Sequence, residues 1–313
     1  MKKVLFTALA LSLSFISFAQ EQQQQPQKPE KPSNGWSHKG VFGINLSQSS
    51  YTNWASGGQS SINGLGIIDY ELHYMSEKFT WNTELNASLG YSFTDFKKKP
   101  TKTEDKIELR SMVGLKATEH FFYSGEVAFR SQFAKGYDYS VDSTHYISKF
   151  LAPAYINFGL GMEWVPNDYF SIYLSPVSSR LTIVNDDRLA SEGAFGVNEL
   201  DKYDTVPHSH VDKVRYEFGA RFVAKVSYPI TDDIFIGSKL ELFSNYLNHP
   251  ERVDVDWQNL ILLKVNDWLN CNLTTHLIYD YDIPFYDENH QKIEGSKVQF
   301  KEVLSVGLTF KLK

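Results

Sequence analysis

FTWNTELNASLGYSF, from Phe79 to Phe93, decides the fold because its side chains alternate strictly in character. Odd-numbered positions are mostly apolar or aromatic, and even-numbered positions carry Thr, Asn, Glu, Ser and Gly. Such alternation indicates a β-strand with one apolar and one polar face. The stretch is far longer than the roughly 5–6 residues of a typical globular strand. It suits a strand that crosses a bilayer at a tilt, which needs about 9–11 residues and often extends further.

The same alternation recurs at 154–164, 216–226 and 269–279. In water, an apolar face of this length must meet another sheet, whereas in a membrane it meets lipid while the polar face lines the lumen. We predict about twelve strands, an even number as closed bacterial barrels have. Their predicted ranges are 40–48, 61–75, 78–94, 105–117, 120–133, 150–164, 168–183, 212–228, 233–246, 252–266, 268–282 and 297–312.

The connections between these strands alternate in length. Short turns are predicted at 75–77, 118–119, 165–168, 229–233 and 266–267, and the other connections are mostly long polar loops, at 49–60, 95–104, 134–149, 184–211, 247–251 and 283–296. This is the layout of an outer-membrane barrel, with turns in the periplasm and loops outside. The predicted fold class is therefore an all-β, antiparallel transmembrane β-barrel of the outer membrane.

Aromatic residues and the last strand fit the same fold. Trp81, Trp164 and Trp268 lie beside short turns, where amphipathic rings favour the membrane interface. The final segment SVGLTFKLK alternates to the end of the sequence, as expected of a strand read by the barrel-assembly machinery, although Lys313 stands where an aromatic residue is usual.

The N-terminal segment predicts export. Residues 1–19 have two lysines, a short apolar run and a small-residue cleavage site, which together indicate a secretory signal peptide. Residues 20–35 are rich in Gln and Pro and predict a disordered leader. Residues 36–313 are then a single barrel domain in the cell outer membrane, with outer-membrane lipid as its surroundings.

Composition excludes several classes of protein. The chain has 313 residues and one cysteine, Cys271, so it forms no internal disulfide. Its formal net charge is −6, which becomes −8 once Lys2 and Lys3 leave with the signal peptide, and this argues against nucleic acid as a partner. After the signal peptide, no apolar run approaches the roughly 20 residues that a membrane-spanning helix needs.

The strand register turns many charges toward the lumen. Acids and bases are about equally numerous there, so they either pair and fill the lumen or line a pore for small solutes. Glu126, Glu241, Lys225 and Lys239 share this inward register. The residues singled out as the charged lining are Glu84, Glu108, Arg110, Arg130, Arg215, Glu217 and Arg221.

Two loops are candidates for a plug or a binding site. The first, SSYTNWASGGQSS at 49–61, holds Asn53 and Trp54 beside Gly57 and Gly58, which permit a turn with positive φ. The second lies at 184–211 and contains GAFGV, with Phe195 and Gly196. These loops either fold back over the barrel mouth or contact a ligand or partner protein, since binding residues concentrate in loops on rigid scaffolds.

Signals for enzymatic chemistry are weak. His208 and His210 could ligate a metal with a loop acid such as Asp204, but the sequence fixes no third ligand, and a solvated loop is the simpler interpretation. No Ser/His pair stands out as a nucleophile with its base. The expectation is a protein that is not an enzyme and has no catalytic residues, metal or cofactor.

The sequence resembles the DUF3078 family of exported proteins from Bacteroidetes-type bacteria. The matching stretches include QSSYTNWASGGQSSI at 48–62, FLAPAYINFGLGMEW at 150–164, LFSNYLNHPERVDVDWQNLI at 242–261 and QFKEVLSVGL at 299–308. The resemblance implies an outer-membrane location and implies no reaction, because none is known for the family.

Three functions remain open at the level of sequence. The first is a porin-like channel or transporter for small solutes, whose polar lumen is plugged by loops. The alternative is a non-conducting structural or accessory barrel that binds partner proteins in an envelope complex. An outer-membrane enzyme is the third and has the least support.

Overall fold

The structure is a computed structural model that describes residues 34–50, 60–94, 99–139, 142–197, 212–266, 268–281 and 296–312. Within these residues, no helix is long and apolar enough to cross a membrane.

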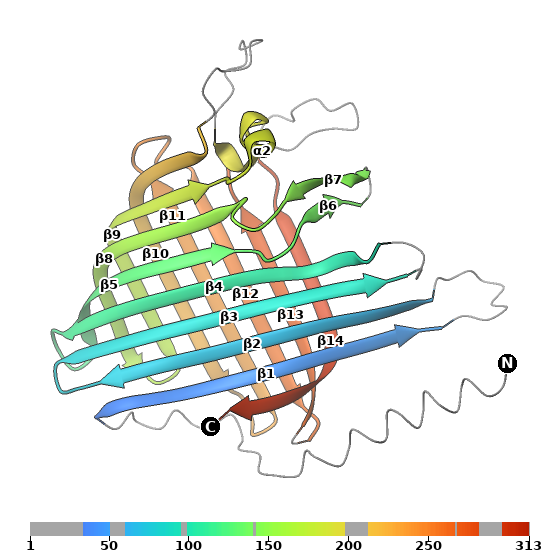
Figure 1. The fold of residues 1–313 in the computed structure, drawn as a ribbon. Coiled ribbons are helices and arrows are strands. Elements are labelled where there is room, and N and C mark those ends of the chain that lie inside the picture. The colour runs from blue at the N-terminus through green and yellow to red at the C-terminus, as the bar shows by residue number, and fades with distance from the viewer. Residues whose placement is uncertain are drawn as a thin grey trace.

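Twelve long strands of the described chain form one closed antiparallel barrel, which confirms the predicted fold class (Figure 1). Each strand except β1 and β14 pairs with its two neighbours in chain order, and β1 pairs with β14 to close the ring. The strands are β1 (Gly35–Ser49), β2 (Ser61–Met75), β3 (Phe79–Phe93), β4 (Thr101–Lys116), β5 (Phe121–Ser131), β8 (Ala154–Asn167), β9 (Phe170–Ile183), β10 (Val214–Pro229), β11 (Ile234–Asn245), β12 (Val253–Lys264), β13 (Leu269–Tyr279) and β14 (Gln299–Leu312).

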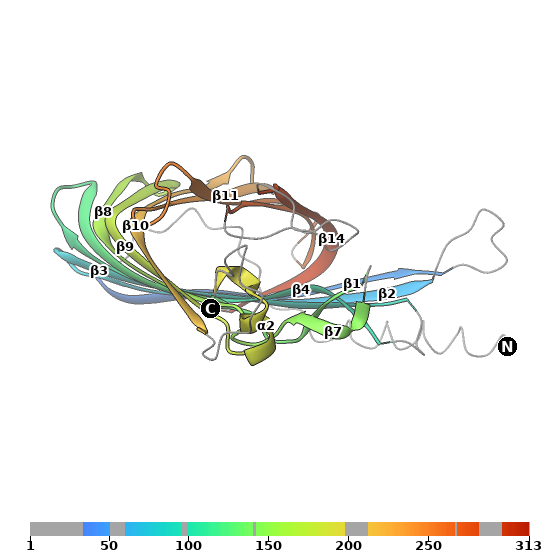
Figure 2. The same ribbon diagram turned by 90° about the horizontal axis from the view of Figure 1, so that it is seen from above.

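The pleat of the strands separates an apolar outer wall from a polar inner one, as alternation requires. Leu304 on β14, Leu160 on β8 and Leu115 on β4 are among the most exposed apolar side chains. Viewed from above, the ring is flattened, with β1 to β4 along one nearly flat side and β11 and β14 on the opposite curved side (Figure 2). The flattening brings the inner faces of opposite strands within reach of long side chains.

Aromatic rings gather at the end of the barrel that carries the short connections, which we call the turn end. Trp36 packs against Tyr74 and Trp81, with ring centroids 5.0 and 5.8 Å apart. Trp164 stacks on Phe121 at 6.2 Å. This belt contains two of the three tryptophans predicted at the rim, Trp81 and Trp164.

Tryptophans on the outer wall donate their indole N–H groups to neighbouring hydroxyls. Trp81 Nε1 donates to Ser111 Oγ at 2.8 Å, and Trp257 Nε1 donates to Ser238 Oγ at 3.0 Å. An indole N–H facing hydrocarbon needs such a partner, because lipid offers none. These isolated polar residues therefore fit an apolar outer wall.

The opposite end, which we call the loop end, carries structure that periodicity did not predict. The stretch predicted as a loop at 134–149 contains a small hairpin of β6 (Gly136–Asp138) and β7 (Asp142–Ser148). The loop predicted at 184–211 begins with the short helix α2 (Asp187–Ser191) and the 3-10 turn η2 (Ala194–Gly196). These elements are too short to produce a periodic pattern, so sequence alone reads them as loop.

Two glycines lie at irregularities in the strand pairing of the wall and are closely approached by a neighbouring backbone. The register of β8 on β9 shifts between Leu160 and Met162, and the register of β10 on β9 shifts between Gly219 and Arg221. A Cβ at Gly161 would overlap the carbonyl oxygen of Leu174, and one at Gly219 would overlap that of Ser244. Only glycine lets the neighbouring backbone approach this closely.

The Gly161→Ala variant is expected to lose about 1–3 kcal/mol of unfolding free energy, because its methyl group meets rigid backbone. Gly43→Ala is the matched control on an inward position, since its Cβ would lie 3.6 Å from the Leu308 carbonyl oxygen, an ordinary contact. Urea unfolding of the two refolded barrels measures the difference. Equal unfolding free energies of the two variants would contradict this expectation, because they would show that the backbone next to Gly161 shifts at little cost.

Candidate functional site

The lumen is the candidate functional site, because the inward faces of most barrel strands place charged side chains there. Lys225 on β10 contacts both oxygens of Glu84 on β3, at 2.8 and 2.7 Å. Arg110 on the neighbouring strand β4 lies 3.3 Å from the same carboxylate. The Lys225–Glu84 contact joins strands that are not neighbours in the barrel, so it crosses the lumen.

The centre of this network is Glu126 on β5. Arg110 donates to its Oε2 from Nε at 3.1 Å and from Nη2 at 2.8 Å. Arg221 on β10 contacts the other oxygen, Oε1, and binds Glu241 on β11 through two bonds of 2.8 and 2.9 Å. The side chain of Glu126 is 0% exposed and that of Arg221 is 2% exposed, so this pair is buried in the centre of the network.

A second set of pairs joins β4 and β5 to β11 and β12. Lys239 lies 2.9 Å from Glu108, and Arg130 lies 2.7 Å from Asp256. His276 on β13 holds the second oxygen of Asp256 at 3.0 Å. The Lys239–Glu108 and Arg130–Asp256 pairs therefore also cross the lumen, because their strands are not neighbours in the barrel.

Further pairs lie nearer the loop end. Arg215 contacts Glu217 at 2.8 Å on the same strand, and Arg180 on β9 contacts Asp254 on β12 at 2.8 Å. Lys301 on β14 reaches Glu104 on β4 at 2.7 Å. The ion pairs therefore extend from the turn end through the middle of the barrel to its mouth.

The network holds the lumen in one arrangement. A buried ion pair gains little over apolar packing, but removing one partner is costly because it leaves a charge without compensation. Each central charge here has at least two opposite neighbours: Glu126 has two arginines, and Arg110 has Glu84 and Glu126. The walls are therefore joined by a connected set of charges rather than by separate pairs.

All seven residues singled out as the charged lining face the lumen. The structure brings Glu84, Arg110 and Arg221 together through Glu126 and Lys225, whereas Arg215 and Glu217 pair separately. Sequence reasoning missed the partners, because strict alternation gives the direction of a side chain and not which strand lies opposite. Six residues predicted to form loop or metal sites lie outside the described residues, so their roles stay predictions: Asn53, Trp54, Gly57, Gly58, His208 and His210.

Phe195 and Gly196 lie in η2, within a small apolar cluster at the loop end. Phe195 packs against buried residues that include Ala152, Val184 and Leu189. Its φ of 58° and the φ of 73° at Gly196 place both residues in the left-handed region, so GAFGV forms a tight turn. The structure thus gives Phe195 a packing role at the mouth.

Asp186 connects this cluster to the hairpin. Its Oδ1 accepts from the Leu189 amide at 2.9 Å and caps α2, while its Oδ2 accepts from Tyr146 Oη at 2.7 Å and pairs with Lys149 Nζ at 2.6 Å. Burial alone would raise the pKa of the Asp186 carboxyl. The bonds from Lys149, Leu189 and Tyr146 outweigh burial and hold that pKa well below its usual value.

A closed antiparallel barrel with an apolar outside and an ion-paired inside defines the protein as a β-barrel of the outer-membrane type. Residues 46–137 match the family model described as Protein of unknown function (DUF3078), which confirms the resemblance over this part of the chain. The similar stretches from residue 150 onward lie outside the matched range and stay a prediction. No curated protein matches the sequence.

Solved structures that are similar to the chain are barrels with little sequence identity. The COG4313 outer membrane channel from Pseudomonas putida F1 is 12% identical with a TM-score of 0.39, over 93% of this chain and 100% of that one. The NanC porin is 10% identical with a TM-score of 0.38, over 88% and 100%. The translocator domain of autotransporter NalP from Neisseria meningitidis is 11% identical with a TM-score of 0.32, over 90% of each chain. The barrel assignment stands on the strand pairing of this chain itself.

The Lys239→Met variant is expected to lose about 2–3 kcal/mol of unfolding free energy, somewhat less than the roughly 3–5 kcal/mol for breaking a fully buried pair, because Lys239 keeps some exposure. Lys39→Met is the matched control, since the Lys39–Glu71 pair is exposed at 75% and 42% and contributes about 0–1 kcal/mol. Urea unfolding in lipid vesicles measures both. Similar losses in the two variants would contradict a structural role for the cross-lumen pair.

The Asp186→Asn variant is expected to speed hydrogen exchange in residues 184–197 at neutral pH. Asparagine can still cap the helix, so the variant isolates the lost charge opposite Lys149. Asp187→Asn is the control, because Asp187 pairs with Lys213 on the surface with 87% of its side chain exposed.

Acid should have the same effect on the wild type. Because the folded pKa of Asp186 is lowered, its stabilisation is present above the unfolded pKa of about 3.9 and is lost as pH falls below it. Exchange corrected for its intrinsic pH dependence should therefore rise in this segment only below about pH 4. A rise that begins at higher pH would point to another group.

Proposed function

We propose that the protein is a channel for small solutes in the outer membrane, held closed at rest by the ion pairs that cross its lumen. The observation that carries this proposal is the connected set of charges around Glu126, which joins β5 to β4 and β10 inside the barrel. In this proposal the loop end faces the outside of the cell. The lumen charges bind and exclude solutes and carry out no reaction.

The chemistry of the filling supports a channel. Apolar side chains of similar volume would close a barrel with equal or greater stability. Charged side chains can instead exchange partners with water and with ionic solutes, and the charges of a lumen tune its selectivity. A lumen closed by ion pairs therefore suits a barrel that opens.

A second candidate is a non-conducting accessory barrel that binds a partner protein in the cell envelope. The near-complete burial of Glu126 and Arg221 favours it, because a buried ion pair obstructs the passage of a solute. Barrel-assembly machinery would insert the protein in either case.

The test is conductance of the refolded protein in planar bilayers. The double variant Glu126→Ser/Arg221→Ser removes both members of the central pair, and Arg110 and Glu241 keep Glu84 and Lys239 as neighbours. We expect few current steps from the wild type and frequent, discrete steps from the double variant. Lys39→Ser, which changes an exposed pair outside the network, should behave like the wild type.

Folding of each barrel is checked by its shift in mobility on unheated gels. If neither the wild type nor the double variant conducts although both are folded, the channel proposal is wrong and the accessory role stands. If the two conduct equally, the ion pairs do not close the lumen.

A further inference from the structure

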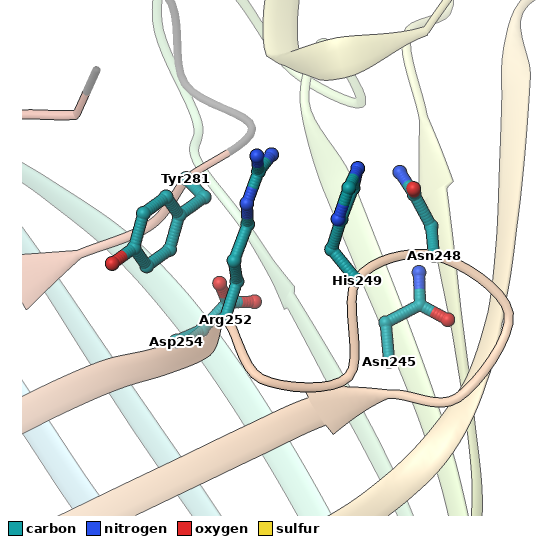
Figure 3. A pocket seen from close by; sticks show the side chains of 6 residues that line it. All are labelled: Asn245, Asn248, His249, Arg252, Asp254 and Tyr281. Atoms are coloured by element: carbon teal, nitrogen blue, oxygen red, sulfur yellow. The ribbon is translucent and has the colours of Figure 1, made fainter.

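A shallow pocket lies at the loop end, where the chain passes from β11 to β12. The atom-free space of this pocket, including its open side, is about 260 Å³. Figure 3 shows its lining, in which Arg252, His249 and Asn248 extend side by side from the same loop. The residues that line it are Asn245, Asn248, His249, Arg252, Asp254 and Tyr281.

The loop is fixed by its own hydrogen bonds. Ser244 Oγ donates to the Pro250 carbonyl at 2.7 Å, and the Arg252 amide donates to the His249 carbonyl at 2.9 Å. The Leu247 amide donates to Asn245 Oδ1 at 3.0 Å. His249 adopts a left-handed backbone with φ of 48°, which turns the chain at this point. The side chains therefore project from a defined scaffold.

Three described carboxylates near the pocket are already engaged. Asp254 pairs with Arg180 at 2.8 Å, and Glu251 pairs with His249 at 3.0 Å. The third nearby acid, Glu217, accepts from Asn245 Nδ2 at 3.4 Å and from Arg215 at 2.8 Å. None of them neutralises Arg252 by a direct ion pair.

Arg252 differs in this from the arginines of the lumen. Its guanidinium lies over the Tyr281 ring, 5.5 Å from the centroid, and forms no ion pair or side-chain hydrogen bond within the described part of the chain. The Asn248 amide likewise has no side-chain hydrogen bond among those residues. Arg110, Arg130, Arg180, Arg215 and Arg221 all pair with a carboxylate.

We propose that this pocket binds the oxyanion of a small solute, a carboxylate or a phosphate, through Arg252 and Asn248 at the mouth of the barrel. The planar guanidinium presents several N–H donors in a fork that matches the oxygens of either group. Tyr281 holds the guanidinium from one face and leaves its edge for the ligand. The inference rests on the proposed function in one respect: if the protein is a channel, the anion bound here belongs to the class of solute that enters it.

The test measures binding rather than transport. Titration calorimetry of the folded protein in detergent uses glucuronate, glucose 6-phosphate and glucose, which share a sugar ring and differ in the oxyanion. We expect one or both anions to bind and glucose not to bind. The stronger of the two anions identifies which oxyanion the pocket prefers.

Arg252→Gln is expected to weaken anion binding by about tenfold or more, the size expected for losing a charge-assisted hydrogen bond. Arg252→Lys keeps the charge but loses the fork, so its binding should be intermediate. Lys213→Gln makes the same change of charge at the loop end but outside the pocket, where Lys213 pairs with Asp187, and it should bind like the wild type.

Three results would overturn the inference. Glucose could bind as well as the anions, none of the three solutes could bind, or Arg252→Gln could bind the anions as the wild type does. The outcome is separate from the conductance test. If the barrel binds anions but never conducts, the anion-binding pocket is supported and the channel proposal is wrong. If it conducts but binds no anion, only the proposal of the pocket is wrong.

Discussion

Every backbone N–H and C=O group that faces hydrocarbon must find a partner within the protein, and this constraint governs the rest of the structure. The pairing of β1 with β14, from Gly40 opposite Leu312 to Asn45 opposite Gly307, removes the two free edges that an open sheet would expose. Closure also gives each strand a fixed inner and outer face. The apolar outer wall and the charged lumen both follow from that single pairing.

Closure alone leaves open what fills the inside. The ring is flattened (Figure 2), and long basic side chains from β10 and β11 span its lumen to reach β3 and β4. Lys225 reaches Glu84, and Lys239 reaches Glu108, across the lumen. The shape of the ring and the ion pairs therefore support one another, because a rounder ring would separate the partners.

The sequence predicts the wall well and the contacts across it poorly, for physical reasons. The strand at Phe79–Phe93 was predicted at 78–94, because alternation over a long stretch is a local property of the chain. Lys239 and Glu108 were both predicted to face inward, yet their pairing joins residues 131 positions apart and depends on the curvature of the whole ring. The helix α2 was missed because five residues cannot establish a helical period. Asp186, which caps it, could have been recognised only as one of many acids in a polar loop.

The distribution of paired and unpaired charge along the barrel gives the proposed channel two separate parts. In the middle, Glu126 lies between two arginines that already satisfy it, so an entering anion would have to displace a carboxylate that is covalently held in place. At the mouth, Arg252 forms no ion pair with the described residues, so an anion can bind there without displacing any of their carboxylates. Binding of an anion therefore costs less free energy at the rim than in the centre of the lumen. A barrel built in this way would select its solute where it enters and resist its passage where the walls are joined.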